Sequence, residues 1–199
     1  LVLGLLLLTF FKGDAQSNKE PITAQIAIGV NNPIENGDTN GYFSNYINFP
    51  TVNLGIQYLF ADQLGAKLDF GYNRASSKEG SFDYTLNYTR VNAQLVYSFS
   101  KLLSFLPDRL DLVAHAGPGI SFTKPTDNFS DNTYTFLNAL AGFELHYRLS
   151  ESVTIFSDLG YVFSLASEDT YDLNVDGFSF NDDIVYLTFG LSFQLTGAK

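Results

Sequence analysis

The chain contains no cysteine, no methionine and no tryptophan among its 199 residues. Without cysteine there is no disulfide, no thiol nucleophile, no thiolate metal site and no lipid-modified N-terminal cysteine. Because even an initiator methionine is missing, we expect the translated chain to begin upstream of Leu1. Basic residues are also scarce, with 11 Lys and Arg against 21 Asp and Glu. The resulting net charge of −10 argues against nucleic acid as a partner, since phosphate binding needs clustered positive charge.

Charged residues make up only 16% of the chain, below the roughly 25% of an average soluble domain. Hydrophobic residues reach 45%, yet the mean hydropathy of +0.02 excludes a protein built from many membrane-spanning helices. The one long apolar run, residues 1–11, is shorter than the roughly 20 residues that a spanning helix needs. We therefore predict that residues 1–15 are the remnant of a secretory signal peptide, with small residues at Gly13 and Ala15 before the cleavage point. A buried core helix is the alternative, but the polar residues that follow show no helical periodicity.

From residue 21 onward, apolar and polar side chains alternate, which is the pattern of β-strands with two unlike faces. The last such segment is the clearest, with one face formed by Val185, Leu187, Phe189, Leu191, Phe193 and Leu195. Eight segments about as long as tilted transmembrane strands are predicted at residues 22–30, 52–60, 64–73, 86–99, 110–122, 137–149, 153–165 and 185–195. In the fourth segment the apolar positions change parity between Tyr88 and Val91, so we predict a β-bulge around Thr89 and Arg90.

The connections between these segments alternate in length. Long polar connections are expected at residues 31–50, 74–83, 124–133 and 166–182, and tight turns at residues 61–63 and 150–152. The connection at residues 100–109 is an exception, because it is longer than the tight turn expected at its place. Long loops on one rim and short turns on the other are typical of outer-membrane β-barrels.

Alternation alone does not tell whether the apolar face points to lipid or into a ligand cavity, as in a soluble lipocalin-like binder. Two features favour lipid. The polar face is rich in Gly, Ser and Asn and poor in the Lys and Glu of a soluble surface. Aromatic residues of the apolar face gather near both ends of the strands, as at the two interfaces of a membrane. They are Tyr58, Phe60, Tyr97, Phe99 and Tyr147 near the short turns, and Phe70, Tyr72, Tyr161 and Phe163 near the long loops.

Four segments carry a family resemblance: the Ala15–Gln16 junction, residues 116–122 (AGPGISF), the step at residues 159–161 (LGY), and residues 187–193 (LTFGLSF). On these, the mature chain resembles the OmpA/OmpX-like small outer-membrane β-barrels, especially the porin-family "outer membrane β-barrel" proteins of Bacteroidetes. The resemblance implies a location in the outer membrane of a Gram-negative bacterium. Chains of this family usually end on an aromatic residue, whereas here six residues follow Phe193. We expect either a tolerated tail or a further domain downstream.

Charged residues at inward parity form a candidate site in the lumen. The predicted lumen charge network consists of Lys67, Asp69, Glu144, Arg148 and Asp158, with Asp111, His115 and His146 at the same parity. One interpretation is a proton or ion path, or an acid–base pair. We favour the other, in which opposite charges neutralise one another inside a filled barrel, since eight strands enclose only enough space for side chains.

The histidines and serines also invite comparison with hydrolase triads. However, no serine lies in a Gly-x-Ser-x-Gly context, and neither histidine lies in a motif of the lipid-A-modifying barrel enzymes. We therefore expect no catalytic residues and no cofactor, with a barrel lipid-modifying enzyme as a disfavoured alternative.

The last long connection holds the sharpest local motif. Asp172, Asn174, Asp176 and Asp183, with Gly177 at the turn, repeat the ligand spacing of an EF-hand calcium loop. The twelfth position is Asp where an EF-hand has Glu, and strands replace the flanking helices. A solvated acidic loop is the simpler interpretation, and a weak Ca²⁺ site at these residues is the candidate to test.

The sequence thus predicts an all-β fold, an eight-stranded antiparallel up-and-down transmembrane β-barrel over residues 16–199. Its expected role is structural or interactive, with the barrel displaying acidic loops outside the cell. A small porin-like channel for ions or small solutes is the main alternative. The expected partners are membrane lipids, lipopolysaccharide and an extracellular ligand that the sequence does not identify. We expect a monomer that binds no nucleic acid.

Overall fold

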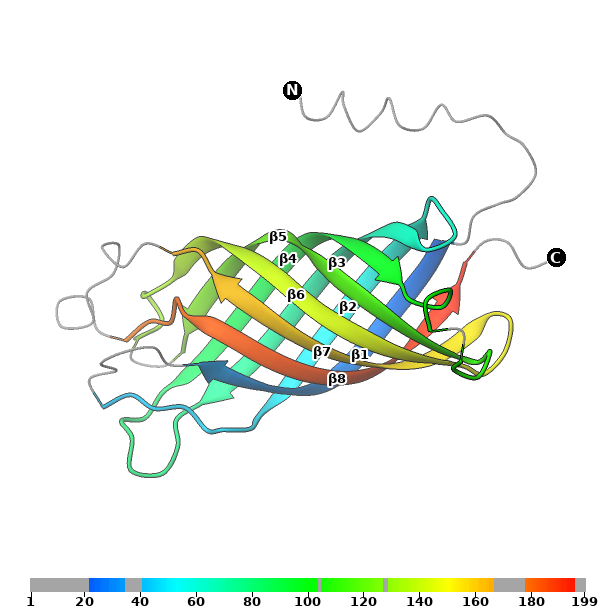
Figure 1. Cartoon of the computed structure of the whole chain (residues 1–199). Helices are drawn as coiled ribbons and strands as arrows, with labels where there is room; N and C mark the ends of the chain where they lie inside the picture. The colour runs from blue at the N-terminus through cyan, green and yellow to red at the C-terminus, as the bar shows by residue number, and fades with distance from the viewer. Residues whose placement is uncertain (1–21, 35–40, 104, 127–128, 167–177, 196–199) are drawn as a thin grey trace, which may run out of the picture.

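The computed structural model describes residues 22–34, 41–103, 105–126, 129–166 and 178–195. In this part of the chain the alternating segments form eight strands. They are β1 (Ile22–Ile34), β2 (Asn48–Leu59), β3 (Leu64–Ser76), β4 (Thr85–Ser98), β5 (Leu110–Pro125), β6 (Tyr134–Arg148), β7 (Val153–Ser164) and β8 (Asp183–Gln194). Each strand pairs with the next and β1 pairs with β8, all antiparallel, so the sheet closes into a barrel (Figure 1). The predicted fold class is confirmed. Among the described residues, no helix has the length and apolar character needed to cross a membrane.

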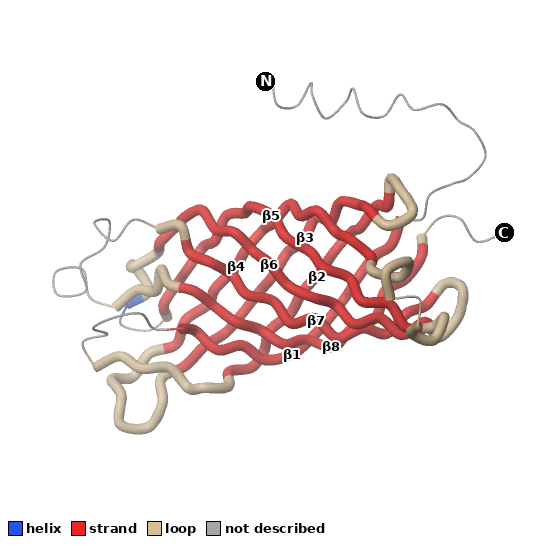
Figure 2. The backbone as a smooth tube through the Cα atoms, viewed as in Figure 1, coloured by secondary structure: helices blue, strands red, loops and turns tan. Residues whose placement is uncertain are grey.

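The connections divide between the two ends of the barrel, as Figure 2 shows. The connections that follow β1, β3, β5 and β7 lie at one end, which we call the loop rim. The connections that follow β2, β4 and β6 lie at the other end, the turn rim, where β1 also begins and β8 ends, and those after β2 and β6 are the short ones. The β4–β5 connection, residues 99–109, is the long exception on the turn rim that the sequence predicted.

The outward face of the barrel is an apolar belt. Ile26 is 51% exposed, Leu68 59% and Phe189 62%, whereas their polar neighbours along the strands face inward. Water-exposed apolar side chains in such number would be unfavourable, because each loses the free energy of burial. The belt therefore faces lipid, and the expectation that the apolar face points outward is confirmed.

The predicted bulge in β4 is wrong. β4 pairs with β3 in unbroken register from Thr85 to Tyr97, and Arg90 takes an ordinary inward position. Leu86 and Tyr88 also face inward, because the interior itself becomes apolar towards the loop rim. The parity change in the sequence therefore reflects a lumen that turns from polar to apolar along β4, while the backbone stays regular. A true irregularity lies in β1, whose register with β2 shifts between Gly29 and Asn31.

The loop-rim end of the lumen is filled by an apolar plug. Its buried members are Ala75, Tyr84, Leu86, Tyr88, Phe136, Leu140, Val162, Phe178, Phe180, Ile184 and Tyr186. Loop residues join this packing, since the Phe178 ring lies 4.0 Å from the Tyr84 ring and 4.9 Å from the Tyr42 ring, centroid to centroid. The bases of the loops are thus fixed to the barrel through aromatic contacts.

Candidate functional site

Between the apolar plug and the turn rim, the lumen holds buried charges. Lys67 and Asp69 on β3, Arg90 on β4, Glu144 on β6 and Asp158 on β7 all face inward, and none is more than 5% exposed. Glu144 and Asp158 are direct partners in the β6–β7 register. The structure therefore brings four of the five predicted lumen residues together and adds Arg90.

Glu144 accepts three contacts at the centre of this cluster. Its Oε1 lies 2.5 Å from Lys67 Nζ, which forms an ion pair shielded from solvent. Its Oε2 accepts a hydrogen bond of 3.1 Å from Gln25 Nε2 and lies 2.5 Å from His146 Nε2. Such multiple pairing is what a buried carboxylate requires, because desolvation of an unpaired charge is costly.

Arg90 is the second cation and the residue that the sequence reasoning missed. Its guanidinium pairs with Asp69, donates to Asn53 Oδ1 at 3.1 Å, and lies 4.9 Å from the centre of the Tyr186 ring. Gly71, its register partner on β3, makes room for it, since a Cβ there would lie 2.6 Å from Arg90 Cζ. The sequence signal for an inward Arg90 is a glycine at the facing position of the neighbouring strand. That signal can be used only when the register between β3 and β4 is known.

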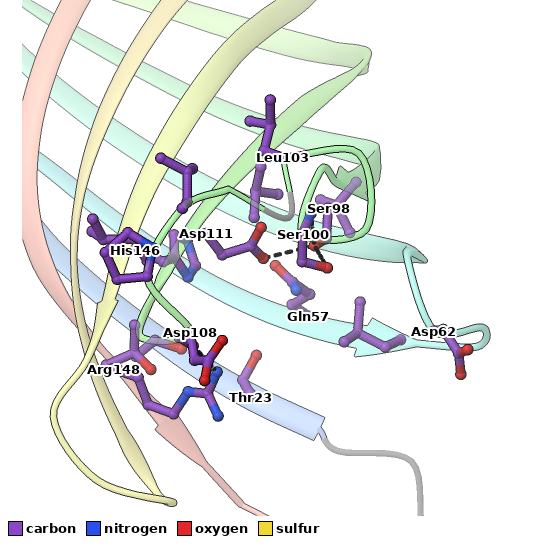
Figure 3. A pocket seen from close by; sticks show the side chains of 18 residues that line it. Thr23, Gln57, Asp62, Ser98, Ser100, Leu103, Asp108, Asp111, His146 and Arg148 are labelled. Atoms are coloured by element: carbon purple, nitrogen blue, oxygen red, sulfur yellow. Dashed lines mark hydrogen bonds between the residues drawn. The ribbon is translucent and has the colours of Figure 1, made fainter.

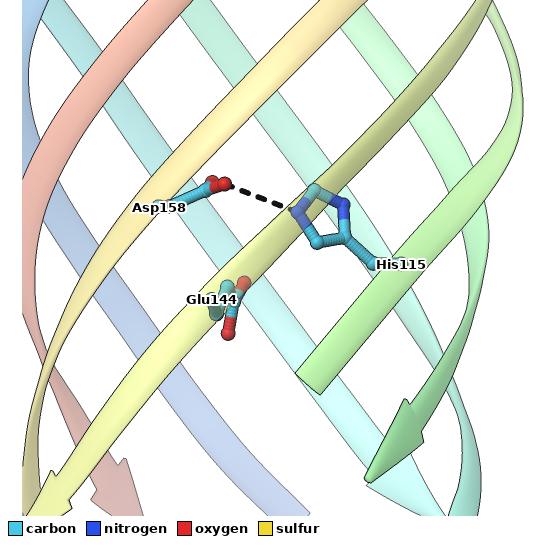
Figure 4. A group of neighbouring side chains, drawn as sticks. All are labelled: His115, Glu144 and Asp158. Atoms are coloured by element: carbon cyan, nitrogen blue, oxygen red, sulfur yellow. Dashed lines mark hydrogen bonds and ion pairs between the residues drawn. The ribbon is translucent and has the colours of Figure 1, made fainter. Parts of the chain in front are cut away.

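His115 on β5 completes the cluster, as Figure 4 shows for its contact with Asp158. Its Nε2 lies 3.0 Å from Asp158 Oδ1 and its Nδ1 lies 2.6 Å from Gln94 Oε1, so both ring nitrogens face oxygen atoms. The His115 ring is therefore held from both sides. The other Asp158 oxygen accepts from the Tyr186 hydroxyl at 3.2 Å. Among the described residues, Lys67, Arg90 and the His115 imidazole face three carboxylates, and we call this set the lumen network: Lys67, Arg90, His115, Asp69, Glu144 and Asp158.

The same side chains include types that bind metals. One ligand atom each from His115, Glu144 and Asp158 lies within 4.8 Å of the others. Glu144 is already paired with Lys67, however, and Arg90 lies on Tyr186, whose hydroxyl contacts Asp158. A divalent ion would have to displace the contacts that these side chains already make, so the geometry fits an ion-pair network better than a metal centre.

Arg148 does not belong to the lumen network, and this part of the prediction is wrong. It lies at the end of β6, four residues beyond Glu144, where its Nη2 donates to the backbone oxygen of Asp108 at 2.6 Å. Four strand residues span about 13 Å, which carries Arg148 out to the turn rim despite its inward parity. Parity indicates a face of the sheet and says nothing about depth.

A cavity of about 550 Å³ opens between the lumen network and the turn rim, and we call it the vestibule (Figure 3). The β4–β5 connection forms one wall through Leu103, Leu106 and Asp108. His146 lies at its inner end and contacts Glu144. At its mouth, Lys101 Nζ lies 2.7 Å from Asp62 Oδ2, and this hydrogen bond lowers the pKa of the Asp62 carboxyl.

Of the predicted calcium ligands, only Asp183 lies among the described residues. Asp172, Asn174 and Asp176 lie outside the described residues. Asp183 begins β8, where its Oδ2 accepts from the Tyr161 hydroxyl and its Oδ1 from the Ser164 amide, both at 2.7 Å. Both oxygen atoms are therefore engaged with β7, and an ion at this position would have to compete with these bonds.

Comparisons of the sequence give little about function. The family model described as "Protein of unknown function, DUF481" matches residues 100–194, a little under half of the chain. No curated protein matches the chain in sequence.

Comparison of the structure defines the class. The fold is similar to that of Neisserial surface protein A, at 12% identity and a TM-score of 0.58, covering 88% of this chain and 96% of that one. A major outer-membrane protein of Thermus thermophilus is similar at 12% identity and a TM-score of 0.58, and the match covers 89% of this chain and 100% of that one. The structure of Ail, the attachment invasion locus protein of Yersinia pestis, in complex with the heparin analogue sucrose octasulfate is similar at 16% identity and a TM-score of 0.51. The match covers 88% of this chain and 97% of that one.

These likenesses show that the chain has the fold of the small outer-membrane β-barrels. The resemblance to OmpA/OmpX-like barrels is thereby confirmed at the level of the fold. Together with the apolar belt, the fold supports association with membrane lipid and the predicted location in the outer membrane of a Gram-negative bacterium. In barrels of this architecture the long loops face the outside of the cell and the short turns face the periplasm.

Proposed function

We propose that the protein is a non-conducting outer-membrane barrel with a structural and interactive role, which displays acidic loops at the cell surface. The observation that carries this proposal is the filled lumen. The apolar plug occupies the loop-rim half, and the lumen network occupies the middle, with Leu86, Tyr88 and Arg90 no more than 1% exposed. A continuous water path is the requirement for a channel, and these two layers interrupt it in series.

The loops provide the interactive part of the role. The four segments that join the strands at the loop rim, residues 35–47, 77–84, 126–133 and 165–182, hold eleven of the 21 acidic residues and a single lysine. Aromatic contacts between Tyr42, Tyr84 and Phe178 hold the described bases of three of these segments together. An acidic surface on a fixed base suits a cationic partner, or lipopolysaccharide phosphates bridged by divalent cations.

Single-channel recording in planar bilayers tests this proposal. We expect no conductance steps from the refolded mature chain. The matched control carries Lys67→Ala, Glu144→Ala, Tyr88→Ala and Tyr186→Ala, which empties both layers and should give measurable steps once folded. Regular conductance steps from the unaltered protein would contradict the proposal and support a small channel.

We further propose that the barrel is not an enzyme. Both histidines are engaged in the lumen, where His115 is 2% exposed and His146 contacts Glu144, out of reach of a lipid substrate on the apolar belt. Mass spectrometry of lipid A from cells that produce the protein should show no change against cells with an empty vector. A mass shift that matches loss or gain of an acyl chain would contradict this proposal.

A further inference from the structure

The vestibule is lined by both apolar and polar residues. Seven apolar residues line it: Leu59, Val96, Leu103, Leu106, Pro107, Leu110 and Val113. The remaining lining is polar and carries three carboxylates, Asp62, Asp108 and Asp111, against one guanidinium, Arg148. Such a cavity suits a small amphipathic molecule, since convergent polar groups within an apolar enclosure are what fix a ligand's orientation.

Two buried oxygen atoms in this lining have no hydrogen-bond partner among the described residues. They are Gln57 Oε1 and Asp111 Oδ1, and the whole Gln57 residue is only 7% exposed. The other Asp111 oxygen accepts from Ser98 Oγ at 2.7 Å, which fixes the orientation of the carboxylate. Figure 3 shows the Gln57 and Asp111 side chains pointing into the cavity. Buried acceptors without donors are costly, so this part of the lining suits a donor, and the Asp111 charge favours a cationic one.

Arg148 offers the opposite chemistry. One of its nitrogens donates to the Asp108 backbone oxygen at 2.6 Å, which holds the guanidinium at the cavity. A guanidinium has five N–H donors, so most remain for an anionic group, and a carboxylate matches their planar spacing. Asp108 itself contributes only its backbone oxygen to this contact.

We propose that the vestibule binds a small molecule that carries both an ammonium group and a carboxylate: a free amino acid or a short peptide. Asp111 receives the ammonium group, Arg148 receives the carboxylate, Gln57 offers a further acceptor, and the apolar residues of the lining accept an aliphatic side chain. The mouth lies on the turn rim, so the ligand comes from the periplasm. This site is independent of the surface role proposed above, since it lies on the other side of the lumen network.

Isothermal titration calorimetry on the refolded mature chain in detergent micelles tests the proposal. The probes are L-leucine, the dipeptide leucyl-leucine, 3-methylbutylamine, which lacks the carboxylate, and 4-methylpentanoate, which lacks the ammonium group. We expect saturable binding of at least one of the first two, and binding at least tenfold weaker for the last two. Tighter binding of the dipeptide would identify peptides as the source, and tighter binding of leucine would identify free amino acids.

Variants assign the two ends of the ligand. Asp111→Asn should weaken binding of the zwitterionic probe at least tenfold. Arg148→Gln should also weaken binding of the zwitterionic probe, but should leave the binding of 3-methylbutylamine unchanged. Lys101→Gln, on the rim beside Asp62, is the matched control and should bind as the unaltered chain does. Heat-modifiable gel migration confirms that each variant is folded. The proposal is overturned if neither zwitterion binds saturably, or if Asp111→Asn and Arg148→Gln both bind like the unaltered protein.

Discussion

Lys67 and Glu144 form an ion pair whose side chains are 4% and 1% exposed. Removing one partner leaves the other charge buried without compensation, which typically costs about 3–5 kcal/mol. We therefore expect Lys67→Met and Glu144→Gln each to lower the free energy of unfolding by about that amount, and the double variant to lower it by less than the sum of the two. Urea titrations of the barrel folded in liposomes measure all three variants.

The exposed pair on the turn rim is the matched control for this cycle. Lys101 and Asp62 lie 2.7 Å apart, with side chains 61% and 82% exposed, so their attraction is screened by water and salt. Lys101→Met and Asp62→Asn should leave stability nearly unchanged. Additive losses in the Lys67–Glu144 cycle would indicate independent, water-solvated charges and hence a wider lumen than the structure shows.

At the scale of elements, β8 offers the sharpest test of which face meets lipid. Leu191 points outward and is 38% exposed, whereas its neighbour Ser192 is 7% exposed and lines the vestibule. Leu191→Arg puts a charge on the lipid-facing side, where the cost is about 2–4 kcal/mol at the midplane and smaller towards the interfaces, and Ser192→Arg should cost less because it enters a polar cavity. Folding titrations into liposomes compare the two. Equal costs, or the reverse order, would contradict the assignment of the faces.

The β7–β8 connection remains the candidate calcium loop. Asp172 and Asp176 lie outside the described residues, and Asp183 already accepts two hydrogen bonds from β7. If the loop binds Ca²⁺, the affinity should not exceed the weak extracellular range, with a dissociation constant of about 10⁻⁴–10⁻³ M. Calorimetry on the unaltered chain and on Asp172→Ala/Asp176→Ala measures it. No saturable heat, or heat that survives the double substitution, would leave a solvated acidic loop.

The strands themselves could be predicted because successive side chains of a strand point to opposite faces, and lipid requires every outward side chain to be apolar. The resulting two-residue period can be read from each strand alone. The inward face obeys no such rule. Leu86 and Tyr88 are inward although apolar, because the plug at one end of the lumen is apolar, and a single strand cannot show this. The pairing of Arg90 with Asp69 depends on the register between β3 and β4, and the position of Arg148 depends on depth. The barrel could therefore be predicted from the sequence, whereas the contacts of the lumen network could be identified only from the structure.

For the whole molecule, closure of the sheet has a direct experimental sign. Every strand has two neighbours, so no edge is open for unzipping, and the apolar belt requires a lipid or detergent environment. We expect the purified mature chain to need detergent, and to migrate differently on gels before and after boiling. A monodisperse protein without detergent would contradict the lipid-facing assignment.

The seam of the barrel joins its first and last strands, with twelve residue pairs between β1 and β8. Until β8 arrives, a partly assembled sheet has open edges at β1 and β7, and such edges pair readily with other chains. Contacts between residues so distant in sequence also form slowly, because the entropy of closing the intervening chain is lost before any pairing is gained. The barrel therefore cannot close before β8, residues 183–194, is available to pair with β1. A chain truncated before β8 would keep open edges and would be prone to aggregation and proteolysis.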